Sequence, residues 1–312
     1  MIASAVLAGC LHVADRGMGR TGGHAEAWVI SLADADSSSG PTQALPAAPA
    51  SAPGDSAAPP SAPVRRPSET TASTTSSEAE AGGTHFRVET PRGPVHVFRP
   101  PGYHRATAGV VIYVHGYYVN VDQAWHEHGL GEQFAASRRN ALFIVPEAPQ
   151  SGTENSPWTR LSTLVARACR GARLQVPPGP WVVVGHSAAY RTIVRWLKEP
   201  EIRHVVLVDA LYGNEASFRR WLDGTRAHKM TMIVKGTTKW AEPFAASLPY
   251  TVRAPRVPAE LGELSPAARS AKLLYLSSQI GHFELITERK VLPVILGRTG
   301  LPAVRKTTPP AR

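Results

Sequence analysis

The chain has 312 residues, a formal net charge of +10 and only two cysteines, Cys10 and Cys169. Two cysteines exclude a disulfide-stapled scaffold and a cysteine-rich metal centre. The arginines are scattered, with no run of five or six like charges and no zinc-finger motif, so we expect a solvated basic surface and no nucleic-acid partner.

The first 36 residues contain one recognisable motif, which ends at Cys10. Leu7-Ala-Gly-Cys10 resembles the lipobox of bacterial lipoproteins, which implies acylation of Cys10 and membrane anchoring. However, Met1 to Val6 is short and carries no Lys or Arg, whereas a signal peptide needs a basic start and a longer apolar run. A chance match in an alanine-rich sequence is the alternative. The resemblance predicts a cell-envelope or secreted location rather than a cytoplasmic one.

Residues 37–83 form a segment rich in Pro, Ala, Ser and Thr. Such a segment buries too little apolar surface to offset its loss of chain entropy, so we expect a disordered tether. No later stretch is long and apolar enough to cross a membrane. The composition therefore predicts a folded domain over residues 84–300, with residues 301–312 as a flexible tail.

The folded part contains eight apolar runs of strand length. The first two alternate, as expected for an exposed edge hairpin, and the other six are continuous β-branched runs, typical of strands buried on both faces of a parallel sheet. The predicted strands are 85–89, 95–98, 109–114, 141–145, 181–184, 204–208, 230–234 and 272–276.

Helical patterns separate the inner strands. We expect one at 122–139, one that begins at Ser156 with Pro157 in its first turn, and others at 188–198, 217–226 and 283–296. Cys169 lies in the helical pattern from Leu161 and is expected to be a small buried side chain. Alternating strands and helices predict an α/β fold, a mostly parallel eight-stranded sheet with helices on both faces. This order, with its antiparallel start, resembles the α/β-hydrolase fold.

The segment Gly185-His-Ser-Ala-Ala189 carries the strongest chemical signal. It follows one predicted strand and opens a helix, which is the context of a nucleophile elbow: a sharp turn that lifts a serine hydroxyl above the sheet. Small residues are needed beside such a turn, and Ala189 stands where the family usually has a second glycine. We therefore predict Ser187 as the nucleophile; the alternative is an ordinary helix-capping serine.

A nucleophilic serine needs a base. His282 follows the last predicted strand, where the α/β-hydrolase family places its catalytic histidine. The acid that orients this histidine is less clear, because the segment after the seventh strand has no carboxylate until Glu242. Asp209 ends the sixth strand and matches those family members that carry the acid there. We favour Asp209 over Glu242, and a loop-capping role for Asp209 is a further alternative.

Backbone amides should stabilise the oxyanion of the tetrahedral intermediate. The resemblance assigns this role to the amide of Ala188 and, through the His115-Gly116 motif, to that of Tyr117. Side chains near the expected crevice are candidates for substrate contact, and a long segment at 240–266 could form a lid. The substrate-binding candidates are His115, Gly116, Trp158 and Tyr212.

These residues predict a serine hydrolase that needs no cofactor and no metal. Its substrate would be a small-molecule, lipid or polymer ester, thioester or amide. The histidines at 126 and 128 lie two apart on a predicted helix and should point away from each other, so they do not suggest a metal site. The alternative function is a non-catalytic binding domain with the same fold, displayed on the cell envelope.

Overall fold

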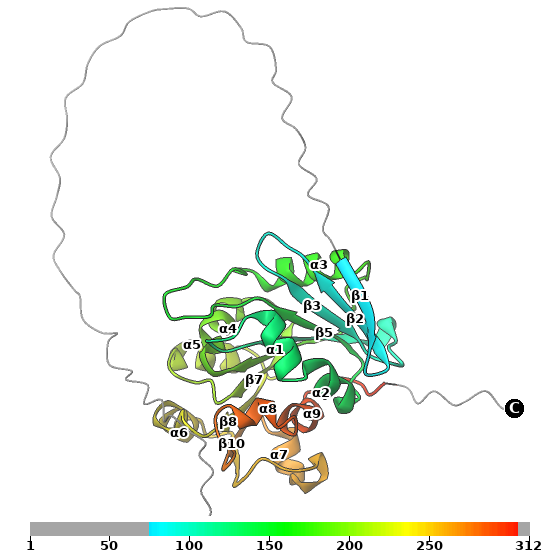
Figure 1. Ribbon diagram of the computed structural model, residues 1–312. Helices are drawn as coiled ribbons and strands as arrows, with labels where there is room; N and C mark the ends of the chain where they lie inside the picture. The colour runs from blue at the N-terminus through cyan, green and yellow to red at the C-terminus, as the bar shows by residue number, and fades with distance from the viewer. Residues whose placement is uncertain (1–74, 305–312) are drawn as a thin grey trace, which may run out of the picture. The chain divides into compact units, whose positions relative to one another are not determined.

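The computed structural model describes residues 75–304, and a ten-stranded sheet crosses this part of the chain (Figure 1). The strand order is β1-β2-β3-β5-β4-β6-β7-β8-β10-β9. The strands are β1 (Thr75–Glu80), β2 (Gly83–Val88), β3 (Val95–Arg99), β4 (Gly109–Val114), β5 (Ala141–Pro146), β6 (Trp181–His186), β7 (Ile202–Val208), β8 (Lys229–Val234), β9 (Thr251–Ala254) and β10 (Leu273–Ser277).

The sheet combines an antiparallel edge with a parallel body. The antiparallel edge consists of the neighbouring pairs β1-β2, β2-β3 and β3-β5. From β5 onward in the sheet order, through β4, β6, β7, β8 and β10 to β9, every neighbouring pair is parallel. Every residue of β4, β5 and β6 is buried, as strands covered on both faces require. Without β1 and β9, the remaining strands follow the order of the α/β-hydrolase fold, which confirms the predicted fold class. The prediction of eight strands was wrong, because it missed these two edge strands.

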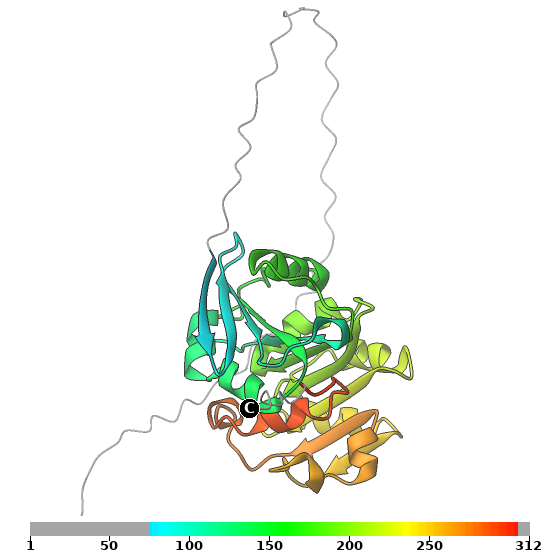
Figure 2. The same cartoon turned by 90° about the vertical axis from the view of Figure 1, so that its right-hand side faces the viewer.

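Helices cover both faces of the sheet (Figure 2). Alternate residues of β4 belong to two separate apolar clusters: Val110 and Ile112 pack with α3 to α6, and Val111 and Tyr113 with the other helices. The helices are α1 (Val121–Glu127), α2 (Leu130–Ser137), α3 (Leu161–Gly171), α4 (Tyr190–Trp196), α5 (Glu215–Asp223), α6 (Thr238–Ala246), α7 (Pro266–Ser270), α8 (Glu284–Thr287) and α9 (Val291–Leu296). Three 3₁₀ turns within the described residues are η1 (Arg105–Thr107), η2 (Ser187–Ala189) and η3 (Leu261–Glu263).

Several predicted helix bounds were wrong. The helix expected over 122–139 is broken between α1 and α2, where Gly129 has a φ of +58° that continues no right-handed helix. The helix expected from Ser156 begins only at Leu161, and Ser156 instead donates a hydrogen bond to the carbonyl of Trp158. The last predicted helix is split in two by Arg289, whose φ is +61°. Cys169 is buried in α3, as expected.

The folded domain extends beyond both predicted ends. β1 pairs with β2 through a two-residue turn in which Ala81 and Gly82 both have positive φ, the geometry that suits tight hairpins. Residues 75–83 are therefore not part of a disordered linker. At the other end Leu301 is buried and the amide of Val304 bonds to Arg138, so residues 301–304 are not a flexible tail. Cys10 and the rest of the predicted tether lie outside the described residues.

The first part of the segment 240–266 packs on the core and its middle forms an edge strand. α6 contributes Ala241 and Phe244 to the core, and β9 pairs with β10 at the sheet edge. Within residues 75–304, each helix is too short or too polar to serve as a membrane span.

A buried arginine joins the last helix to the sheet. Arg298 is 4% exposed and donates hydrogen bonds to the hydroxyl of Thr231 at 2.6 Å, to the carbonyls of Ala268 and Ala271, and to the ring of His204. Burial lowers the pKa of Arg298 to about 10. No carboxylate pairs with this guanidinium in the described part of the chain, so its charge is compensated by these dipoles.

We expect Arg298→Ala to lower the free energy of unfolding by about 3 kcal/mol or more, because it leaves a cavity and several buried acceptors without a donor. The exposed Arg256, which pairs with Glu263 at the surface, is the matched control, and Arg256→Ala should change stability by about 0.5 kcal/mol or less. Urea unfolding followed by circular dichroism measures both. Equal stability of the two variants would contradict a structural role for Arg298.

Candidate active site

Ser187 lies on a strained turn between β6 and α4. Its φ is +56°, a left-handed conformation that only about a few per cent of non-glycine residues adopt and that costs backbone strain. The neighbourhood admits only small residues: a Cβ on Gly185 would lie 2.4 Å from Ile193 and 2.9 Å from Ala189, and one on Gly116 would lie 2.8 Å from the Cβ of Ser187. This close approach has the geometry of a nucleophile elbow. It also explains why alanine suffices at position 189.

Asp209 and His282 form a hydrogen-bonded pair. Asp209 follows the end of β7 with a φ of +46°, and His282 lies in the loop between β10 and α8. The distance between Oδ2 of Asp209 and Nδ1 of His282 is 2.7 Å, and the Asp209 carboxylate is completely buried. Residues 73 positions apart in the sequence are thus brought together at the carboxyl end of the parallel strands.

The Asp209 carboxylate is surrounded by further donors. It accepts hydrogen bonds from the amides of residues 235–237, each at 2.9 Å, and from the Thr237 hydroxyl at 2.8 Å. Burial alone would raise the pKa of Asp209, but the bonds from His282 and the three amides outweigh it and hold this pKa well below its usual range. An ionised Asp209 requires the hydrogen of His282 on Nδ1, which leaves Nε2 free to accept a proton.

This low pKa predicts a pH-dependent stability. A carboxyl group whose pKa is lower in the folded state contributes stability that is present above its unfolded-state pKa of about 3.9 and is lost as the pH falls toward the folded value. The difference in unfolding free energy between the wild type and Asp209→Asn should therefore shrink as the pH falls from about 5 to 2. Urea midpoints across this range test it. A difference that stays constant with pH would contradict the assigned shift.

Glu242, the other candidate acid, lies elsewhere. Its carboxylate pairs with Arg253 at 2.8 Å, and about half of its side chain is exposed. The hydrogen bond from Arg253 lowers the pKa of Glu242. His282 is therefore bonded to Asp209 and not to Glu242.

His186 packs against His282 and hydrogen-bonds to its backbone. The sequence did not predict this contact. Its ring centroid lies 4.7 Å from that of His282, and its Nε2 donates a hydrogen bond of 2.9 Å to the His282 carbonyl. Burial, followed by the nearby His282, lowers the pKa of His186 to about 3, so this ring is neutral and packs without adding charge. Its position between Gly185 and Ser187 was the only signal available, and histidine there carries no specific chemistry.

Tyr212 lies close to both Ser187 and His282. Its hydroxyl is near enough to the Ser187 side chain to affect the pKa of the phenol, and its ring meets that of His282 edge-on with centroids 6.5 Å apart. Within residues 75–304, no hydrogen bond joins Ser187 directly to His282. Burial, and then the charge of Asp209, raises the pKa of Tyr212 well above its usual range. Tyr212 thus remains a protonated phenol beside the serine.

The loop after β4 approaches Ser187 from the other side. His115 is buried, donates from Nδ1 to the Gly116 carbonyl at 2.8 Å and accepts at Nε2 from the amide of Ala148 at 3.1 Å. The amide of Tyr118 bonds to the carbonyl of Gln150. By contrast, the amide of Tyr117 has no backbone partner within the described residues and remains available to an oxyanion. His115 therefore holds the loop in shape rather than facing a ligand.

Trp158 lies apart from these groups. It is 1% exposed and belongs to the apolar cluster beneath α3 and α4, where its carbonyl accepts a hydrogen bond from Trp196 at 2.7 Å. Arg92 packs over its ring. Trp158 therefore supports the core on that face of the sheet.

Comparisons with known proteins give similarity only among solved structures. No protein-family model matches the chain, and no curated protein does. An S-formylglutathione hydrolase from Agrobacterium tumefaciens is similar at 12% identity and a TM-score of 0.46, over 72% of this chain and 99% of its own. A fluorophosphonate-binding serine hydrolase of Staphylococcus aureus is similar at 10% identity and a TM-score of 0.47, over 73% of this chain and 99% of its own. A feruloyl esterase module from Clostridium thermocellum is similar at 9% identity and a TM-score of 0.44, over 77% of this chain and 92% of its own.

Proposed function

We propose that this protein is a serine hydrolase that cleaves an ester, thioester or amide through an acyl-enzyme on Ser187. The observation that carries the proposal is the 2.7 Å contact between a buried, ionised Asp209 and His282, beside a serine held on a strained elbow. A left-handed backbone at a non-glycine residue costs stability, and such costs are found at sites where the chemistry requires them. A carboxylate with a strongly shifted pKa beside a histidine is likewise typical of functional sites.

The chemistry begins with a proton transfer. His282 takes the hydroxyl proton of Ser187 on Nε2 as Oγ attacks the carbonyl carbon, and Asp209 stabilises the resulting imidazolium. The amides of Tyr117 and Ala188 would bind the oxyanion. His282 then gives its proton to the leaving group, and a water molecule activated by the same ring hydrolyses the acyl-enzyme.

Ser187 must form a hydrogen bond to His282 before it can react. The described residues show no such bond, and the Tyr212 hydroxyl lies close to the serine. Catalytic hydrogen bonds often tighten only when substrate is bound. We infer that substrate in the crevice displaces the Tyr212 hydroxyl from Ser187, so that Tyr212 contacts the substrate.

Two exposed aromatic rings adjoin the proposed machinery. Phe283, next to His282, is 56% exposed, and Tyr118, next to Tyr117, is 70% exposed. Large exposed apolar side chains beside a reactive group favour a substrate with an apolar part. We therefore propose that the substrate is a small-molecule, lipid or polymer ester, and a panel of p-nitrophenyl esters of increasing chain length would rank these classes.

A fluorophosphonate probe tests the proposed function, since it reacts covalently with activated serines. The full-length wild type should be labelled, Ser187→Ala should not, and Ser270→Ala, which removes an exposed serine hydroxyl on α7, should be labelled like the wild type. Labelling that persists in Ser187→Ala would exclude Ser187 as the nucleophile.

A second candidate function is binding without catalysis. The observation in its favour is that Ser187 has no hydrogen bond to His282 within the described residues, whereas the Tyr212 hydroxyl lies close to it. A folded wild-type protein that resists the probe and hydrolyses no ester in the panel would favour this binding domain.

Anchoring through Cys10 stays a prediction, because Cys10 lies outside the described residues. We propose that a detergent-phase partition experiment in a bacterial host would show the full chain in the detergent phase and Cys10→Ser in the aqueous phase. Equal partitioning of the two proteins would exclude the lipoprotein interpretation and its cell-envelope location.

A further inference from the structure

Three side chains with metal-ligating atoms converge at the antiparallel edge of the sheet. Glu78 and Glu80 lie two apart on β1 and so share one face, and Glu78 stands directly opposite His85 on β2. Nδ1 of His85 is 2.9 Å from Oε1 of Glu78 and 3.4 Å from Oε2 of Glu80. The three ligand atoms all lie within 4.8 Å of one another.

The 3.4 Å separation of His85 and Glu80 suits two ligands of a small divalent cation, and the 2.9 Å contact with Glu78 would have to lengthen by about 0.5 Å on binding. Ligands of a tetrahedral zinc ion lie about 2.0–2.2 Å from the metal and hence about 3.3–3.6 Å from one another. The side chain of His85 is 4% exposed, that of Glu80 23% and that of Glu78 64%. Protein therefore encloses one side of the cluster, and the other side is open for water to complete the coordination.

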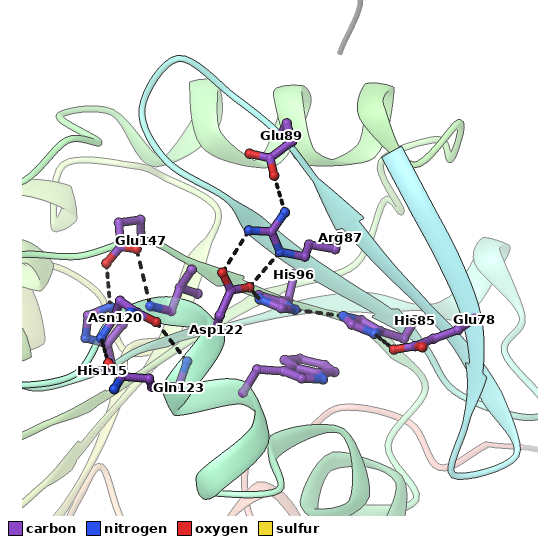
Figure 3. A network of polar contacts seen from close by, with 12 residues as sticks. Glu78, His85, Arg87, Glu89, His96, His115, Asn120, Asp122, Gln123 and Glu147 are labelled. Carbon is purple, nitrogen blue, oxygen red and sulfur yellow. Dashed lines mark hydrogen bonds and ion pairs between the residues drawn. The ribbon is translucent and has the colours of Figure 1, made fainter. Parts of the chain in front are cut away.

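A chain of hydrogen bonds behind His85 fixes its ring (Figure 3). Nε2 of His85 lies 2.8 Å from Nδ1 of His96, and Nε2 of His96 lies 2.8 Å from a carboxylate oxygen of Asp122. Asp122 in turn pairs with the guanidinium of Arg87. Metal-binding histidines are typically oriented in this way, by an acceptor on the second ring nitrogen.

Trp125 packs against the histidines of this hydrogen-bonded chain. Its ring stacks on those of His85 and His96, with centroids 4.4 and 4.9 Å apart. Its indole N–H also donates to Oε2 of Glu80 at 3.1 Å. Trp125 therefore orients two of the three ligand-bearing side chains. Binding of a metal ion would then cost little conformational entropy in these side chains.

The hydrogen bonds of this chain are compatible with a metal ion on Nδ1 of His85. Close contacts join Glu78 to His85, His85 to His96 and His96 to Asp122, and the metal ion would replace only the first of them. The N–H at Nε2 of His85 then donates to His96, and the N–H at Nε2 of His96 donates to Asp122.

We propose that Glu78, Glu80 and His85 bind a divalent transition-metal ion, and the mixed imidazole and carboxylate ligands select zinc over calcium or magnesium. This site is separate from the Ser187 machinery and does not rest on the proposed hydrolase activity. It would clamp β1, the most exposed strand of the sheet, onto β2 and, through Trp125, onto α1.

Equilibrium dialysis of the chelator-treated full-length protein against Zn²⁺ tests the site. The wild type should bind one more zinc ion per protein molecule than the double variant Glu78→Gln/Glu80→Gln. Glu80→Gln alone should raise the Kd of that zinc ion at least tenfold. Glu260→Gln, which changes an exposed glutamate elsewhere, should bind like the wild type. The difference in bound zinc between wild type and double variant decides the outcome, and the total bound to either protein does not.

Thermal unfolding gives a second readout that needs no enzyme activity. Zn²⁺ at a hundredfold excess over Kd should raise the wild-type Tm by about 5–10 °C, and this shift should be absent from the double variant. Ca²⁺ at the same concentration should shift the Tm of neither protein. Circular dichroism of the metal-free proteins shows that the glutamine variants fold. Equal zinc binding and equal Tm shifts in wild type and double variant would overturn the proposal.

Discussion

Replacing Ser187 with alanine is expected to lower kcat for the best ester of the panel by about a million-fold. The reason is that Oγ is the atom that forms the acyl-enzyme, and an alanine side chain has no such atom. His282→Ala should cost nearly as much, because without its ring the serine proton has no acceptor in the site. Steady-state kinetics on purified variants measures both effects.

The double variant Ser187→Ala/His282→Ala distinguishes one catalytic unit from two independent contributions. If serine and histidine act together, the double variant should be about as slow as either single variant, with residual catalysis from the oxyanion donors. Single losses of only tenfold that multiply in the double variant would refute the acyl-enzyme mechanism. Ser270→Ala controls for nonspecific effects.

The parts of the fold that follow from local pattern were predicted from the sequence. The continuous apolar runs at β4 to β8 can only be buried on both faces, and the glycine and alanine around Ser187 leave little choice but a tight turn. These local signals were strong enough to predict the sheet and the elbow. They also located Asp209 at a strand end, although Glu242 remained an alternative until the structure placed both side chains.

Contacts between distant residues account for what was missed. β1 has the sequence Thr-Ser-Ser-Glu-Ala-Glu, which has no apolar alternation and looks like part of the neighbouring low-complexity segment. Its strand conformation is stabilised by the ladder to β2 and by the contacts of Glu78 and Glu80 with His85 and Trp125. Such tertiary stabilisation overrides low strand propensity, and one sequence alone does not reveal it.

The contact of Tyr212 with Ser187 has the same origin. Tyr212 was a candidate because it follows Asp209 closely, but its hydroxyl reaches Ser187 only because both lie at the carboxyl ends of adjacent parallel strands. Conversely, Trp158 was a plausible pocket wall from its loop position, and the structure places it in the core. Loop conformation decides both cases, and it depends on packing that strand patterns do not encode.

Replacing Asp209 with asparagine is expected to lower kcat by about 10⁴-fold, with a smaller effect on KM. Asparagine keeps the size of the side chain but can present an N–H to Nδ1 of His282, which favours the tautomer whose Nε2 carries the hydrogen and cannot accept the serine proton. It also removes the negative charge that stabilises the imidazolium. The amides of Lys235 and Thr237, which bond to Oδ1, would still find an amide oxygen as acceptor, whereas the amide of Gly236 would lose its acceptor at Oδ2, so part of the local structure should survive.

Glu242→Gln is the matched control, because the same change of carboxylate to amide occurs at the other candidate acid. Glu242 contacts Arg253 on the surface, so its variant should retain kcat within about twofold, as expected for a site outside the machinery. Equal losses in the two variants would overturn the assignment of Asp209. A loss of kcat only in Asp209→Asn, with unchanged fluorescence and circular dichroism at the assay temperature, would attribute the effect to the orientation and charge of His282 rather than to unfolding.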